Sequence, residues 1–154
     1  MTASEAWEPR SWREKLCGCY WLGRMVDKGR RKLQSEEAGD PALLNDYQFG
    51  DHNPSDAIML RFLGLRGAEI LELLRQHADD EKAGAVILAK GGWDAAAIAR
   101  WNFWLPRLYA FVLVGLDADE GRLPPTLGNR LIMAAMRNVI RPPVAAWYRF
   151  REGR

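Results

Sequence analysis

Residues 11–33 read SWREKLCGCYWLGRMVDKGRRKL and decide the fold class. Ser11 and Glu14 have the spacing of a capping box, in which two side chains satisfy backbone amides at the start of a helix. The apolar spacing that follows predicts a helix from Ser11 to about Leu33. The stretch also contains three glycines, each of which costs a helix about 1 kcal/mol relative to alanine. They indicate a kink, a break near Gly18, or close approach of another backbone.

Helix-start and helix-stop signals continue along the chain, and no long alternating strand pattern is present. Polar caps or proline mark the starts, and glycine or proline marks the stops. The expected helices are 54–64, 68–77, 79–91, 94–105 and 107–114, followed by a long helix after Pro125 that Pro142 ends. Residues 35–53 are expected to form a turn-rich loop. The chain is therefore predicted to be all-α, with about six or seven helices.

Length and composition fit one folded domain. The chain has 154 residues, of which 48% are hydrophobic and 27% are charged. Residues 1–8 are expected to be a loose tail. Residues 9–154 are expected to form a single helical domain with a basic helical extension from about residue 123.

The composition argues against a cofactor, a metal site and a membrane span. Cys17 and Cys19 are too close in sequence to pair easily, and two histidines leave few soft metal ligands. No export signal is visible, and the most apolar run is shorter than the roughly 20 residues that span a bilayer. We therefore expect a cytoplasmic protein without cofactor, metal or transmembrane segment.

Both ends of the chain are basic. Residues 122–154 contain seven arginines and one acidic residue, Glu152. Residues 8–32 are also strongly basic, whereas the formal charge of the whole chain is only +2. One interpretation is that the basic ends pack beside an acidic middle, and this is the one we favour. The other is a basic surface for an anionic partner.

The predicted first helix has a polar face. At about 100° per residue, seven side chains fall on it. They are Arg13, Cys17, Tyr20, Arg24, Asp27, Lys28 and Arg31. One interpretation is a solvated stripe in which Asp27 pairs with Arg24 and Arg31, and charged stripes usually are surface features. The other is an anion site, with the arginines binding a carboxylate or phosphate and Asp27 or Lys28 transferring a proton.

Cysteine and tryptophan supply further candidates. Neighbouring cations favour the thiolate of Cys17, so we expect a lowered pKa, but no histidine is placed locally to act as its base. Cys19 is expected in the core. The chain has seven tryptophans. Trp101 and Trp104 are expected to pack in the core, with an aromatic pocket wall as the alternative.

Several short motifs connect the chain to a known family. They are PRS (Pro9–Ser11), Leu16 with Gly18, RMVDKGR (Arg24–Arg30), FLG (Phe62–Gly64), Asp79–Glu81, Trp101–Asn102 and LDADEGR (Leu116–Arg122). Through them the chain resembles a bacterial family of unknown function, DUF5069. The specific motif is RMVDK. The resemblance implies no activity, and it points to Arg24, Asp27 and Lys28 without giving them roles. The chain departs from the family pattern at Cys17, where glycine is expected, and in the basic tail after Arg122.

These observations lead to two functional hypotheses. The first is binding of a small anionic molecule at the first helix, with cofactor-free acid/base chemistry as an additional option. Its catalytic candidates are Asp27 and Lys28, and its ligand-binding candidates are Arg24, Arg31, Tyr20, Cys17, Trp101 and Asn102. The alternative is a non-catalytic module that binds an acidic partner, such as nucleic acid or an acidic membrane, through Arg130, Arg137 and Arg141. No recognition motif is present, and a solvent-facing stripe is the interpretation that we favour for these arginines. The sequence leaves open whether any reaction is catalysed.

Overall fold

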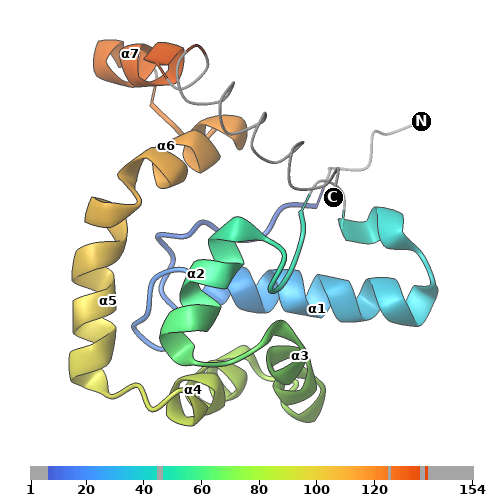
Figure 1. Ribbon diagram of the computed structural model, residues 1–154. Helices are drawn as coiled ribbons and strands as arrows, with labels where there is room; N and C mark the ends of the chain where they lie inside the picture. The colour runs from blue at the N-terminus through green and yellow to red at the C-terminus, as the bar shows by residue number, and fades with distance from the viewer. Residues whose placement is uncertain (1–6, 45–46, 125, 136–137, 139–154) are drawn as a thin grey trace, which may run out of the picture. The chain divides into compact units, whose positions relative to one another are not determined.

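The computed structural model describes residues 7–44, 47–124, 126–135 and 138 (Figure 1). These residues form seven α-helices and one short 3-10 helix, and no strand occurs among them. The elements are α1 (Leu22–Ala38), η1 (Pro41–Leu44), α2 (Pro54–Leu63), α3 (Gly67–Gln76), α4 (Asp80–Lys90), α5 (Ala95–Leu108), α6 (Ala110–Asp119) and α7 (Leu127–Ala135). The prediction of an all-α protein with about seven helices is confirmed.

The chain divides into two compact units, Met1–Leu105 and Pro106–Arg154. The first unit contains α1 to α4 and most of α5, and the second contains α6 and α7. No helix in the described part of the chain is long and apolar enough to cross a membrane.

Helix α1 lies at the centre of the first unit, where it packs against η1, α3 and α4. Leu22, Met25 and Val26 are fully buried. Gly29 is buried as well, and a Cβ atom there would lie only 2.5 Å from Leu74 of α3. Glycine in mid-helix therefore allows α3 to approach the α1 backbone closely.

The predicted start of the first helix at Ser11 is wrong, because α1 begins at Leu22. The capping-box contact does form, since the Ser11 amide donates to the Glu14 carboxylate at 3.1 Å, but it closes only one turn. The chain then reverses at Cys17 and Gly18, whose φ angles of 49° and 74° are left-handed. Two successive residues of this kind make a tight turn and cannot continue an α-helix. The expected break near Gly18 is confirmed.

Most other helix ends lie at the capping residues that the sequence predicts. Asn53, Asp79 and Asp94 accept hydrogen bonds from first-turn amides of α2, α4 and α5. Gly64 ends α2 with a φ of 65°, as a C-terminal glycine does. Local hydrogen bonds of this kind depend on neighbouring residues alone, which is why the sequence predicts them well.

Three boundaries differ from the prediction. The expected loop 35–53 contains the last turn of α1 and the helix η1. Helix α5 continues past Pro106 to Leu108, and the break before α6 falls at Tyr109. The last helix is described only as α7, so Pro142, Arg137 and Arg141 lie outside the described residues.

The structure confirms two of the three predicted core residues. Cys19 is fully buried and Trp101 is 6% exposed, so the core interpretation is confirmed for both. Trp104 is 51% exposed, and the core interpretation is wrong for this residue. Its ring packs edge-on against Phe103, which is also exposed.

Candidate functional site

The cations of the RMVDK motif are buried. Arg24 is 2% exposed and Lys28 is 3% exposed, so neither lies on an open surface. The segment from Tyr47 to Gly50 contacts both, because Lys28 donates to the Gln48 carbonyl at 3.2 Å and the Arg24 guanidinium lies 5.4 Å from the Tyr47 ring. The polar face of α1 is thus covered by another part of the chain.

Lys28 forms a fully buried ion pair with Asp56 of α2. Its Nζ lies 2.6 Å from Asp56 Oδ1, and the side chains are 3% and 0% exposed. The other carboxylate oxygen accepts from the Gly50 amide at 3.1 Å, and the Trp21 indole donates to Oδ1 at 3.4 Å. A buried charge is tolerated when it is paired and hydrogen-bonded in this way. The Lys28–Asp56 pair therefore ties α1, α2 and the preceding loop together.

Asp56 is not among the site residues predicted from the sequence. It lies in the first turn of α2, where acidic side chains are common. Its spacing to Met59, Leu60 and Leu63, all buried, puts it on the apolar face of α2. An acidic residue on an apolar face is the signal that could have identified it.

Two arginines and three aromatic rings contact one another in a row along the covered face of α1. The Arg24 guanidinium lies 5.8 Å from the Trp21 ring and 5.4 Å from the Tyr47 ring. Tyr47 meets Trp7 edge-on, with ring centroids 5.6 Å apart. Arg31 lies 5.3 Å from the Trp7 ring. We call these five residues the α1 ladder, and its cations are within the range at which an aromatic face attracts them.

The Arg31 end of the α1 ladder is the accessible one. Arg31, Trp7 and Tyr47 are each of intermediate exposure, whereas Arg24 and Trp21 are buried. The Arg31 guanidinium donates to the Leu43 carbonyl at 2.6 Å and to the Gln34 side chain at 3.2 Å. Both acceptors are neutral, so these bonds orient the guanidinium, and no carboxylate of the described residues forms an ion pair with it.

Asp27 belongs to a different cluster, which we call the Arg10 network. Its carboxylate accepts from the backbone amide of Arg10 at 2.8 Å and from two guanidinium nitrogens of Arg10. Asp80 accepts from Arg10 and from Arg30, each at 2.6 Å. The predicted pairing of Asp27 with Arg24 and Arg31 is therefore wrong. The physical reason is that the segment before α1 does not continue the helix, which brings Arg10 back against it.

The Arg10 network perturbs two of its ionisable groups. The hydrogen bond to Asp27 raises the pKa of Arg10 above its ordinary value, against an opposing effect of burial. For Asp80, burial raises the pKa, and hydrogen bonds from Arg30 and Arg10 lower it by more. The net result is a pKa of Asp80 below its ordinary value. Both shifts favour the charged forms that hold the network together.

The four remaining predicted site residues come together around the turn at Cys17 and Gly18. Asn102 of α5 accepts from the Tyr20 amide at 2.9 Å and donates to the Gly18 carbonyl at 2.8 Å. The Trp101 indole donates to the Tyr20 carbonyl at 2.9 Å. These bonds satisfy the backbone of a turn and attach it to α5, which is a structural role.

The expectation of a lowered pKa for Cys17 is wrong. Burial and, to a smaller extent, the neighbouring Glu81 together raise the pKa of this thiol to about 11. The carbonyl and carboxylate oxygens of Glu81 both lie 3.2 Å from Sγ. The cations expected beside Cys17 do not surround it, because no helix connects Arg13 to Arg24. The thiol is thus protonated near neutral pH.

A hollow of about 500 Å³ lies between the end of α2 and the start of α3. Leu60 and Leu65 are buried at its wall, and the charged lining residues are Asp51, Arg61, Arg66 and Glu69. Asp51 accepts from the Gly67 amide and Glu69 from the Arg66 amide, so both carboxylates cap α3. Opposite charges are balanced in this hollow, which suits a single anion poorly. Within the described residues, no group of three or more potential metal ligands is present.

Comparison with known proteins gives one match. A family model described as a domain of unknown function, DUF5069, matches residues 7–110, more than half of the chain. The matched range contains the eight predicted site residues and ends at the first residue of α6. No curated protein and no solved structure matches the chain. On the extent of this match, the chain belongs to the DUF5069 family.

Proposed function

We propose that the domain binds a small anionic molecule at the accessible end of the α1 ladder, with Arg31 as the anion-binding residue. The observation that carries the proposal is the environment of the Arg31 guanidinium. Among the described residues it has two neutral hydrogen-bond acceptors and an aromatic ring, and no carboxylate. A planar guanidinium held in this way is oriented to bind a carboxylate or phosphate with two parallel hydrogen bonds.

The neighbouring rings support a ligand that is flat as well as anionic. Trp7 and Tyr47 are half-buried and contact each other edge-on, and the Trp7 ring lies 5.3 Å from the Arg31 guanidinium. Their edge-on contact and the buried Arg24 beneath Tyr47 restrict how these rings can move. A site whose side chains are already ordered loses less entropy on binding. An aromatic carboxylate or a nucleotide is the ligand class that these groups suit.

Acid/base chemistry by Asp27 or Lys28 has weaker support. Both oxygens of Asp27 are engaged by Arg10, and Lys28 is held within the buried pair with Asp56. A proton acceptor or donor must reach its substrate, and these groups are occupied. Cys17, Tyr20, Trp101 and Asn102 likewise have contacts that stabilise a turn. The proposal is therefore binding at Arg31, without catalysis.

Thermal unfolding and titration calorimetry with benzoate, inorganic phosphate and adenosine monophosphate test the proposal. At ten times the dissociation constant, a ligand adds about 1.4 kcal/mol to the stability, which raises the Tm by about 4 °C for a chain of this size. We expect such a shift for at least one anion, a smaller one in Arg31→Lys and none in Arg31→Ala.

Arg75→Ala is the matched control, because Arg75 is an exposed arginine that pairs with Glu36 and Glu72 on the surface. It should keep the full shift. Benzamide, the neutral analogue of benzoate, should give none. No shift with any of the three anions, or an equal shift in Arg31→Ala and wild type, contradicts the proposal.

A further inference from the structure

The second unit has apolar side chains that nothing in its described part covers. Leu127 and Leu131 of α7 are 74% and 63% exposed, and no residue of α7 is buried. At about 100° per residue, the two leucines lie within about 40° of each other on the helix. Exposed apolar side chains that lie next to one another can form a patch of the kind that marks an interaction surface.

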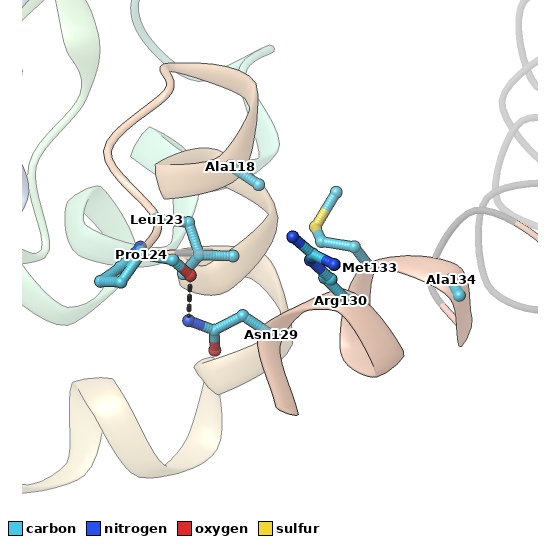
Figure 2. Close-up of a pocket in the computed structure, with 7 residues that line it drawn as sticks. All are labelled: Ala118, Leu123, Pro124, Asn129, Arg130, Met133 and Ala134. Atoms are coloured by element: carbon cyan, nitrogen blue, oxygen red, sulfur yellow. Dashed lines mark hydrogen bonds between the residues drawn. The ribbon is translucent and has the colours of Figure 1, made fainter. Parts of the chain in front are cut away.

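Next to the two leucines, α7 borders a hollow of about 370 Å³ (Figure 2). Its lining is mainly apolar and comes from α6, the segment before α7, and α7 itself. The lining residues are Ala118, Leu123, Pro124, Asn129, Arg130, Met133 and Ala134. Asn129 donates to the Pro124 carbonyl at 2.8 Å, which fixes the start of α7 against the preceding segment.

Arg130 lies on α7 between the hollow and the exposed Leu127 and Leu131. It lines the hollow, and on the helix it lies about 60° from Leu127. Among the described residues, no carboxylate or carbonyl accepts a hydrogen bond from its guanidinium. Figure 2 shows the Arg130 and Met133 side chains extending from α7 on the side where Ala118 of α6 lies. An arginine without an ion-pair partner among the described residues, a mainly apolar hollow and two exposed leucines therefore lie next to one another on α7.

We propose that α7 binds the surface of a membrane that contains anionic phospholipid. Leu127 and Leu131 enter the boundary between headgroups and acyl chains, and Arg130 binds a phosphate at the mouth of the hollow. An amphipathic helix with leucines on one side and arginine beside them is the type that lies in a membrane interface. Charge complementarity favours a lipid surface, because residues 122–154 contain seven arginines and one acidic residue.

This surface is independent of the proposed anion site. Arg31 and the α1 ladder lie in the other unit, and the family model ends at residue 110, before α7. Membrane binding is thus inferred for the part of the chain that follows the matched domain.

Cosedimentation of the full chain with vesicles tests the inference. We expect binding to vesicles of phosphatidylcholine with phosphatidylglycerol at low salt, and much weaker binding to phosphatidylcholine alone. Replacement of both leucines, Leu127→Ser with Leu131→Ser, should lower the partition coefficient at least tenfold, because two apolar side chains no longer enter the interface. Arg130→Ala should lower it about fivefold, and Arg130→Lys should retain most of it.

Circular dichroism of each variant verifies that the helices are intact, and Arg75→Ala in the other unit should bind as wild type does. Two results overturn the inference. One is wild-type protein that stays in the supernatant with anionic vesicles at low salt, even where it is retained on heparin. The other is a doubly substituted leucine variant that binds as tightly as wild type, since the attraction would then be charge alone.

Discussion

Two charged clusters flank helix α1, and they differ in their access to water. The Lys28–Asp56 pair is 3% and 0% exposed, whereas the side chains of the Arg10 network are between 21% and 33% exposed. In the buried pair, each charge depends on the other, because no water can replace a lost partner. In the Arg10 network, water can solvate whichever group remains. Ion pairs with the same N–O distance of 2.6 Å are therefore expected to differ in the free energy that is lost when one partner is removed.

The buried pair gives the largest expected effect. Asp56→Asn removes the charge that compensates Lys28, and it should lower the free energy of unfolding by about 3–5 kcal/mol. Urea denaturation followed by circular dichroism measures the loss. Lys28→Met is the reciprocal variant, and the double variant should be less destabilised than the sum of the two. A loss of under about 1 kcal/mol in Asp56→Asn would contradict the comparison, because it is the value expected of an exposed pair.

The Arg10 network gives an intermediate effect. Asp27→Asn keeps one acceptor oxygen but removes the charge that Arg10 contacts, so we expect a loss of about 1–2 kcal/mol in the same denaturation experiment. Added salt should reduce the difference between wild type and variant, because the group is partly solvent-exposed. A loss equal to that of Asp56→Asn would show that exposure does not distinguish the two clusters.

The contribution of the Arg10 network to stability should depend on pH in the acidic range. The pKa of Asp80 is lowered in the folded state, so its stabilising contribution is present above the ordinary pKa of about 4 and is lost as the pH falls through the lowered value. Wild type should lose this contribution in acid, and Asp80→Asn should show a shallower loss over the same range. Urea denaturation at a series of acidic pH values measures both slopes. Parallel slopes would contradict the lowered pKa.

The smallest effect on stability is expected at Cys17, where the readout is reactivity. With a pKa of about 11, the thiol has roughly a hundredfold less thiolate at pH 8 than an ordinary cysteine of pKa near 9. Alkylation by iodoacetamide should be slow in wild type and faster in Glu81→Gln, because one cause of the raised pKa is removed. Mass spectrometry of the modified peptide distinguishes Cys17 from the buried Cys19. Rapid alkylation of wild-type Cys17 would contradict the shift.

Local signals in the sequence predicted the helices well and the first helix start poorly. The caps at Asn53 and Asp79 depend on side chains within three residues, so they are visible in the sequence. At Ser11 the same local contact forms, but it is followed by a turn that the left-handed Cys17 and Gly18 make. A capping box specifies a first turn only. Whether a helix continues depends on the residues after it.

Six of the eight candidate site residues are predicted on one face of the first helix, and the structure separates the eight into three groups. Arg24, Lys28 and Arg31 lie on the covered side of α1, Asp27 lies in the Arg10 network, and the other four residues surround the turn before α1. The prediction treated Cys17 and Tyr20 as members of the helix, so the error in the helix start carried over to the site. The RMVDK motif alone points to Arg24 and Lys28, which the structure shows to be buried cations.

The all-α class, most of the caps, the break near Gly18 and membership of the DUF5069 family could be predicted from the sequence. Which charged side chains pair with one another depends on the tertiary structure. Lys28 and Asp56 are separated by 28 residues, and Arg10 and Asp80 by 70. Helical periodicity places side chains relative to neighbours within about one turn, and it carries no information about partners on other elements. The packing of α2 and α4 around α1 supplies those partners, and it converts a charged stripe into a buried pair and a partly exposed network.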